Sequence, residues 1–327
     1  MFTNKDLEYR SIFVINCLEH RNLRVSNGEL LLEEVIDDEK KTLTKLPFQK
    51  ILALFVIGHI TITTPLIEKC RKNNVALCVM KQNLRPVFFH ADSAEANYLL
   101  RQRQYAFRKD DISIAKIIMK SKISNQCQLL VNTRMRDELT KDAISQCKDA
   151  IGKMESVDKY ETLMGIEGIT AKKFFAAYFQ TFDWHQRAPR TKCDVLNATL
   201  DIGYTILFNF IEVFARMFGF DPYIGVYHRL WFRRKSLICD LMEPFRCIID
   251  VQTRKGFNLK QFKADDFECR KGEFSLKFEK SGEYYKVFYT ALIEKKRDIF
   301  EYIREYYRCF MQGKPTECYP IFNYQKA

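Results

Sequence analysis

The pattern of hydrophobic and polar residues changes near residue 90. Before that point, apolar residues form short runs, such as VALCVM at 75–80 and RPVFFH at 85–90. Runs of this length that are rich in β-branched and aromatic residues are typical of strands. ILALFVIG at 51–58 and HITITT at 59–64 have the same character. Residues 1–90 are therefore predicted to be mostly β.

Two local signals refine this β-rich part. NLRVSNGELLLEE at 22–34 places Asn27 and Gly28 between two strand-like runs, and this dipeptide favours the tight turn of a hairpin. PLIEKCRKN at 65–73 has a helical pattern instead, and Pro65 suits the first turn of a helix. One short helix is therefore expected among the strands.

Beyond residue 90 the apolar residues recur at helical spacing. Ser93 is a plausible cap for a helix that enters EANYLLRQRQYAF. Further helices are predicted at 114–121, 133–147, 171–182, 194–218 and 284–310, with a small hairpin at 266–280. The expected fold class is α+β, with a β-rich domain at 1–90 followed by a larger α-helical domain at 91–327.

Charge and cysteine content narrow the class of partner. The formal net charge is +12, of which +9 lies in residues 91–327, and this surplus favours nucleic acid or an anionic membrane. The longest clean apolar run, at 51–58, is too short to span a membrane, and the N-terminus lacks an apolar signal region. The 11 cysteines include no C-x-x-C pair, which indicates free thiols rather than a zinc site or disulfides. We expect a cytoplasmic protein without a membrane partner.

The stretch DPYIGVYHRLWFRRKSLICDLMEPFRCIID at 221–250 carries the strongest candidate chemistry. His228 follows turn residues, and Ser236 is a plausible N-cap of the next helix. On that helix Asp240 and Glu243 lie three residues apart and share a face among apolar residues. Buried carboxylates require a positive partner, so a histidine with two carboxylates suggests a divalent metal ion.

Basic residues accompany this stretch. Taken alone, they are typical of a solvated face or loop, but beside a metal site they are predicted to contact DNA phosphates. One group follows His228 and the other precedes the helix predicted at 194–218: Arg229, Arg233, Arg234 and Lys235, and Arg187, Arg190 and Lys192.

Another acidic residue lies upstream. Glu167 stands between Gly165 and Gly168, just before a predicted helix. Glycines give the backbone room to approach a ligand closely. An acid favoured by the helix dipole is the alternative interpretation.

Four motifs in order resemble one known family. They are G-x-E-G before an aromatic-rich helix, D-x-x-N-A-x-L-x-x-G-Y, D-P-Y-I-G-x-x-H and S-L-x-x-D-L-M-E-P-F-R. Together they resemble the "Cas one" family, the CRISPR-associated integrases of spacer acquisition. HITITTPLIEKCRKNNVALCVM is similar to that family's strand–helix–strand. Val195, Tyr227 and RAPR at 187–190 depart from the usual pattern, but none of them is a proposed metal ligand.

The resemblance implies an activity, a metal site and partners. It implies that Glu167, His228 and Glu243 bind the metal and that Asp240 either joins them or orients His228. One imidazole and two carboxylates suit Mg²⁺ or Mn²⁺. The implied reaction is attack by the 3′-hydroxyl of a captured DNA fragment on a phosphodiester at a repeat boundary. The implied partners are double-stranded DNA, a second copy of the chain bound through the β-domain, and the small companion "Cas two" protein.

Two other functions stay open on the sequence alone. A metal-dependent DNA or RNA nuclease that never integrates would use the same site, because water can replace the 3′-hydroxyl. A non-catalytic DNA-binding scaffold would have lost an acidic ligand, and no such loss is visible in the sequence. His185, Asn197 and Tyr204 lie near the motifs but are not assigned a direct catalytic role.

Overall fold

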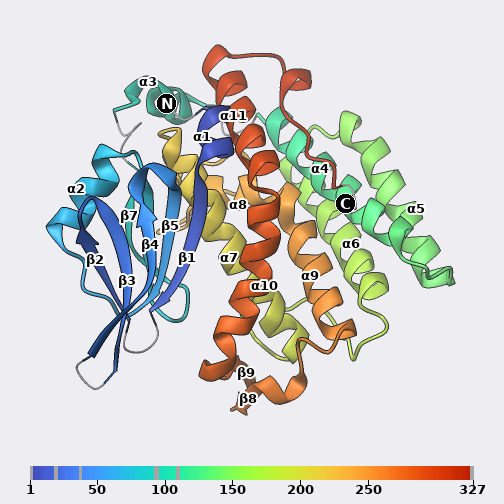
Figure 1. Ribbon diagram of the computed structural model, residues 1–327. Coiled ribbons are helices and arrows are strands. Elements are labelled where there is room, and N and C mark those ends of the chain that lie inside the picture. Colours follow the sequence, from blue (N-terminus) through green and yellow to red (C-terminus); the bar gives the residue numbers. More distant parts are fainter. Residues whose placement is uncertain (1–2, 18–20, 37–38, 92–95, 108–110, 325–327) are drawn as a thin grey trace. The chain divides into compact units, whose positions relative to one another are not determined.

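The computed structural model describes residues 3–17, 21–36, 39–91, 96–107 and 111–324 (Figure 1). The chain forms two structural units. One contains Met1–Gln102 and Asn209–Asp221, and the other contains Arg103–Phe208 and Pro222–Ala327. Two sheets lie in the first unit, whereas the second is mainly helical, so the predicted α+β class is confirmed.

A four-stranded mixed sheet forms the core of the first unit. Its strand order is β1-β5-β6-β7, with β1, β5 and β6 parallel and β7 antiparallel to β6. The bounds are β1 Ser11–Cys17, β5 Ile51–Gly58, β6 Ala76–Met80 and β7 Pro86–His90. All eight residues of β5 are buried, as its unbroken apolar run predicts for an inner strand. Phe48, Leu54 and Leu77 belong to the apolar core around this sheet.

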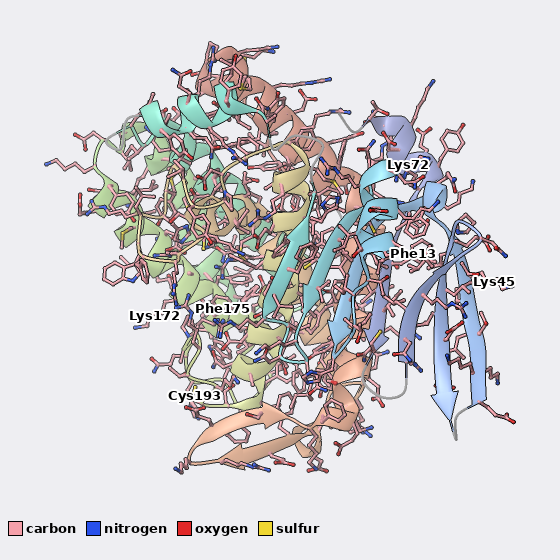
Figure 2. All side chains as sticks on the ribbon, turned by 90° about the vertical axis from the view of Figure 1, so that its left-hand side faces the viewer. Phe13, Lys45, Lys72, Lys172, Phe175 and Cys193 are labelled. Carbon is pink, nitrogen blue, oxygen red and sulfur yellow. The ribbon has the colours of Figure 1, made fainter. Side chains whose placement is uncertain are left out.

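A second, antiparallel sheet has the order β2-β3-β4, with bounds Arg21–Ser26, Glu29–Ile36 and Glu39–Pro47. The predicted hairpin is confirmed. Asn27 and Gly28 both have positive φ, 50° and 80°, which matches the twist of the flanking strands. The sequence did not reveal β4, because nearly all of its side chains are exposed and show no apolar alternation. Lys45, labelled in Figure 2, is one of these exposed residues.

The region from 59 to 73 was only partly predicted. The expected helix is confirmed as α2, Thr64–Lys72, with Pro65 in its first turn. The β-rich interpretation of HITITT is wrong, because no strand covers 59–64. Strand β5 ends at Gly58, whose φ of 120° few other residues adopt. Beyond it, Thr63 already occupies the N-cap position of α2.

Helices α4, α5 and α6 pack against one another in the second unit (Figure 1). Helix α4 also contacts α9 and the short helix η4, and much of its surface is buried, including polar residues. The helices are α3 Tyr98–Ala106, α4 Ser113–Asn132, α5 Glu138–Lys153, α6 Tyr160–Tyr178, α7 Val195–Met217, α8 Ser236–Met242, η4 Glu243–Phe245, α9 Arg246–Asn258, α10 Ser281–Glu294 and α11 Lys296–Gln312. The N-terminal unit begins with α1, Asn4–Tyr9.

The helices expected at 114–121, 133–147, 171–182 and 194–218 correspond to α4, α5, α6 and α7, but α5 begins only at Glu138 and α6 already begins at Tyr160 and ends at Tyr178. The hairpin at 266–280 is confirmed as β8 Phe267–Arg270 and β9 Glu273–Leu276. The single helix expected at 284–310 is wrong, because α10 and α11 are separated at Lys295, whose ψ of 11° leaves the helical range. Ser93 lies outside the described residues, so its capping role stays a prediction.

Helix α7 is long and apolar enough to cross a membrane by length and composition alone. In its most apolar 18-residue window, however, 78% is buried in the structure, as in the core helix of a folded domain. Its first part belongs to the second unit, and its last turns, from Asn209, belong to the first.

Candidate active site

A buried lysine joins two of the proposed metal-binding carboxylates. Lys122 Nζ lies 2.6 Å from Glu167 Oε1 and 2.6 Å from Glu243 Oε2. The three side chains come from α4, α6 and η4. Only 8% of Lys122 and 3% of Glu243 is exposed, compared with 22% of Glu167. Two acids far apart in sequence therefore converge on one cationic group.

Arg246 adds a second positive charge to this cluster. Its Nε lies 2.9 Å from the same Oε2 atom of Glu243. Burial alone would raise the pKa of Glu243, but Arg246, Lys122 and His228 outweigh it and lower that pKa to about 2. Burial opposes the charge of Lys122, yet Glu167 and Glu243 raise the pKa of that lysine. Glu243 and Lys122 therefore both carry their charge at neutral pH.

Glu167 lies inside α6, so the prediction that it precedes a helix is wrong. Leu163, Thr170 and Phe174 are buried on the same helical face, at spacings of four, three and seven residues from Glu167. This face directs the carboxylate towards α4. Further along α6, Lys172 is exposed while Phe175 is buried, and both are labelled in Figure 2.

The two glycines beside Glu167 have a different setting from the one expected. Gly165 and Gly168 are exposed helical residues, and a Cβ added to either would meet nothing within 4 Å. Their backbone conformation therefore requires no glycine. The structure shows open space on this side of α6.

Asp240 organises the loop that carries His228. Its Oδ2 accepts hydrogen bonds from the backbone N–H groups of Val226 and Tyr227, at 2.6 and 3.0 Å. Its Oδ1 accepts one from the His228 backbone N–H at 2.9 Å and lies 2.7 Å from His228 Nδ1. Asp240 is completely buried. Both its oxygens are therefore committed to holding the loop and the imidazole.

Gly225 makes this arrangement possible. A Cβ at this position would clash with Asp240 Oδ2 and would lie 2.8 Å from the Ser236 backbone carbonyl carbon. Ser236 is the first residue of α8 and not its N-cap as predicted, because Lys235 occupies the cap position. The Ser236 hydroxyl instead donates to the Arg229 carbonyl oxygen at 3.2 Å and fastens the other end of the loop.

The geometry fits a hard cation in part. Because Nδ1 of His228 faces Asp240, Nε2 is the ring nitrogen that could bind a ligand. Among the residues that the structure describes, no three His, Cys, Asp or Glu side chains form a group that could hold a metal ion. Glu167 and Glu243 do share one cation, and His228 is near enough to lower the pKa of Glu243. The convergence of all three on one metal ion stays a prediction.

The basic residues after His228 lie on an exposed loop, 229–235. Arg229 pairs with Glu161 at 2.6 Å and stacks over Tyr160 at 4.2 Å, although its side chain is 67% exposed. The Arg233 guanidinium lies 5.0 Å from the centre of the Phe232 ring. Arg234 is half-buried.

The upstream basic residues differ among themselves. Arg187 is bound to Asp201 at 2.5 Å and to Asn197 at 2.7 Å, and its side chain is only 13% exposed. Its contacts are those of a residue that holds the loop on α7. Arg190 is exposed and Lys192 half-buried, and both have positive φ. DNA contacts of these three residues stay a prediction.

Sequence analysis missed Lys122 and Arg246. Lys122 is one of three lysines in α4, with Lys116 and Lys120, and only its burial in the folded structure distinguishes it from the other two. Arg246 ends the motif EPFR, three residues after Glu243, and this spacing places both side chains on one side of the helical turn.

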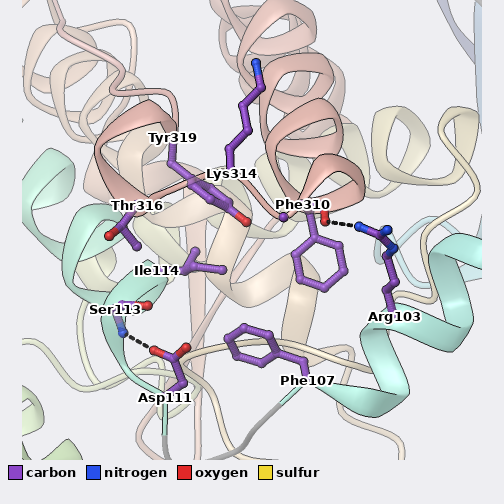
Figure 3. A pocket seen from close by; sticks show the side chains of 10 residues that line it. Arg103, Phe107, Asp111, Ser113, Ile114, Phe310, Lys314, Thr316 and Tyr319 are labelled. Atoms are coloured by element: carbon purple, nitrogen blue, oxygen red, sulfur yellow. Dashed lines mark hydrogen bonds between the residues drawn. The ribbon is translucent and has the colours of Figure 1, made fainter.

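Hollows also lie elsewhere in the second unit, and two of them are defined by their lining residues. The first, of about 360 Å³, lies between the start of α4 and the end of α11 and is lined in part by Phe107, Phe310 and Arg103 (Figure 3). Arg103 donates to the carbonyl oxygens of Phe310 and Met311 and so caps the end of α11. The second, of about 950 Å³, is lined in part by Arg254. Neither lining includes a proposed catalytic residue.

The fold and site together define the class, a two-unit α+β protein with a charged site in its helical unit. The model of the family "CRISPR associated protein Cas1" matches residues 18–290. The chain therefore belongs to the Cas1 family. Curated members of this family that resemble the chain are named CRISPR-associated endonucleases.

Curated relatives carry matching names. "CRISPR-associated endonuclease Cas1 1" of Thermodesulfovibrio yellowstonii is 27% identical over 268 residues, which cover 78% of this chain and 84% of the relative. A "CRISPR-associated exonuclease Cas4/endonuclease Cas1 fusion" of Leptospira interrogans is 27% identical over 314 residues, 88% of this chain and 56% of that protein.

Solved structures share the fold. A Cas1 protein from Thermotoga maritima has a TM-score of 0.75 at 17% identity, over 96% of this chain and 100% of its own. A casposase bound to integration product has a TM-score of 0.75 at 19% identity, over 97% and 96%. A chain of a Cas6-RT-Cas1–Cas2 complex has a TM-score of 0.77 at 20% identity, and this chain covers 36% of it.

Proposed function

We propose that the chain is a metal-dependent DNA endonuclease and integrase that inserts captured DNA fragments, or spacers, into a CRISPR array. The observation that carries this proposal is the convergence of Glu167 and Glu243 on one cationic centre. His228, held by Asp240, stands near it in the same unit. Membership of the Cas1 family and the endonuclease names of the relatives support it.

Glu167, His228 and Glu243 would hold Mg²⁺ or Mn²⁺. Two carboxylates that gather around a single positive charge are suited to a hard divalent cation, and one imidazole is compatible with it. When bound, such an ion polarises a phosphoryl oxygen and lowers the pKa of an attacking hydroxyl.

The chain's own residues supply orientation and fixed charge. Asp240 holds Nδ1 of His228 and so directs Nε2 away from α8. Lys122 and Arg246 place two positive charges beside the carboxylates, where they offset negative charge that develops on phosphoryl oxygens. In the proposed reaction a 3′-hydroxyl oxygen forms a new bond to phosphorus, and the original ester bond breaks to release another 3′-hydroxyl.

The proposed partners are double-stranded DNA, a second copy of this chain and the small Cas2 protein. DNA is supported by the positive surplus of the residues beyond 90. Cas2 is supported by the similar chain in a Cas6-RT-Cas1–Cas2 complex. The second copy is proposed to bind through the β-rich unit, and light scattering at micromolar concentration would contradict this by reporting a monomer.

A strand-transfer assay tests the function. A labelled duplex with 3′-hydroxyl ends is incubated with a supercoiled plasmid that bears a repeat, with Mg²⁺ or Mn²⁺, and with or without Cas2. We expect joined product from the parent chain and none from a fragment with 3′-dideoxy ends. Glu167→Gln, His228→Ala and Glu243→Gln should each abolish product.

Calorimetric titration with Mn²⁺ gives a readout that is independent of activity. The three variants should each bind Mn²⁺ more weakly than the parent. Cleavage of the plasmid without joining would identify a nuclease instead, and full activity of Glu243→Gln would remove that residue from the site.

A further inference from the structure

Two large aromatic side chains stand in solvent three and four residues after His228. Trp231 is 77% exposed and Phe232 is 82% exposed, and Leu230 next to them is 48% exposed. Aromatic side chains normally contribute most to stability when they are buried. Adjacent exposed aromatic residues in a folded protein indicate a binding surface.

The loop that carries them is fastened at both ends. Asp240 holds residues 226–228, and the Ser236 hydroxyl binds the Arg229 carbonyl oxygen. Within the loop, the Arg234 backbone N–H donates to the Trp231 carbonyl oxygen at 3.0 Å, which forms a turn. The exposure of Trp231 and Phe232 is thus set by a closed turn.

The charge around the aromatic pair selects the type of partner. Arg229, Arg233, Arg234 and Lys235 lie within the same seven residues, and the Arg233 guanidinium is 5.0 Å from the Phe232 ring. An apolar protein interface would have to desolvate these charges. Nucleic acid satisfies both features at once, because its bases stack on aromatic rings and its phosphates pair with arginine.

The position of Trp231 in the chain indicates which part of the DNA the loop binds. Trp231 is three residues from His228. In a duplex the faces of paired bases are covered by their neighbours, whereas an unpaired base can turn a free face towards an aromatic side chain. We propose that Trp231 and Phe232 stack on unpaired bases at the end of the DNA strand that is delivered to the site. This inference rests on the proposed function and names the part of the substrate that this loop binds.

Binding assays with two DNA duplexes test it. One duplex has a short unpaired 3′ end and the other is blunt, and their paired regions are identical. Trp231→Ala/Phe232→Ala should weaken binding of the unpaired end about tenfold, which corresponds to about 1.4 kcal/mol, and should leave the blunt duplex unaffected. Trp231→Phe should retain most of the affinity. Tyr98→Ala, which removes an aromatic side chain that is 72% exposed elsewhere, is the matched control and should change neither affinity.

Fluorescence provides a second readout. The chain has 2 tryptophans, so in a Trp184→Phe background Trp231 is the only one. The unpaired end should quench its emission more strongly than the blunt duplex does. Equal affinity of the double variant and the parent for the unpaired end would overturn the proposal. So would weakened binding of Cas2 or of a second copy with unchanged DNA affinity. Both duplexes can be bound without integration, so failure of the strand-transfer assay would not be confused with failure of the stacking.

Discussion

Replacement of Lys122 by methionine tests the charge network most directly. Methionine keeps an unbranched apolar stem of similar length and removes only the ammonium group. Glu167 would then lose the cation that lies 2.6 Å away. Glu243, only 3% exposed, would keep Arg246 at 2.9 Å as its positive neighbour.

The size of the effect follows from this burial. Removal of one partner from a buried ion pair destabilises a protein by about 3–5 kcal/mol, because it leaves an uncompensated charge. Since Arg246 remains and Glu167 is partly exposed, we expect a loss near the lower limit, about 3 kcal/mol. This corresponds to a decrease in melting temperature of roughly 5–10 °C.

The assay is unfolding by heat and by denaturant, first with a chelator and then with Mn²⁺. Without metal the variant should be less stable than the parent by the amount above. With Mn²⁺ the variant should gain more stability than the parent, because two carboxylates without their ammonium bind a cation more readily. Lys120→Met is the matched control. Its exposed pair with Glu155, at 3.7 Å, should contribute less than about 1 kcal/mol.

Combination with Glu167→Gln gives the coupling between the two side chains. The double variant should recover part of the loss, since the lysine and its partner are removed together. A Lys122→Met protein within about 1 kcal/mol of the parent would refute the view that this network stabilises the fold. Strict additivity of the two changes would refute the interaction itself.

Three further changes address neighbouring features. Asp240→Asn should weaken Mn²⁺ binding by about 10- to 100-fold in calorimetry, because His228 loses the carboxylate that orients it and the loop loses an acceptor for its backbone N–H groups. Unchanged affinity would contradict this role. Burial raises the pKa of Asp250 to about 7. From about pH 4 to pH 7 the folded chain therefore keeps a proton that the unfolded chain has released. The free energy of unfolding should fall by up to roughly 4 kcal/mol over that range. Asp250→Asn should flatten this dependence in unfolding experiments at pH 5 and pH 7.5, and an unchanged slope would disprove the assignment. Gly168→Ala should stabilise the chain by about 0.5–1 kcal/mol in denaturant unfolding, because the added Cβ meets nothing within 4 Å, whereas a destabilised variant would show that the space is not open.

Sequence patterns predicted the elements whose burial follows a simple period. The unbroken apolar run of β5 and the Asn27–Gly28 turn were sufficient to place a central strand and a hairpin. Strand β4 was missed, because an exposed strand has no apolar periodicity to detect. The break at Lys295 was missed, because apolar spacing continues on both sides of it.

In the candidate site, the sequence indicated the pair that is close in sequence and missed the pair that is distant in sequence. Residues 228 and 240 are near neighbours in sequence, and the structure brings His228 and Asp240 together. Lys122 is 45 residues from Glu167, and only the packing of α4 against α6 brings them into contact. A single sequence carries no signal for such a long-range pair.

The closed loop at 229–235 keeps the position of His228 independent of which side chains stand at the loop tip. Its ends are tied to α8 by Asp240 and Ser236, and its tip, with Trp231 and Phe232, contributes little buried apolar surface. The tip can therefore be exchanged for that of a relative without moving His228. Substitutions at this tip would change the preference for a DNA end during evolution, while the residues that carry out the reaction stay the same.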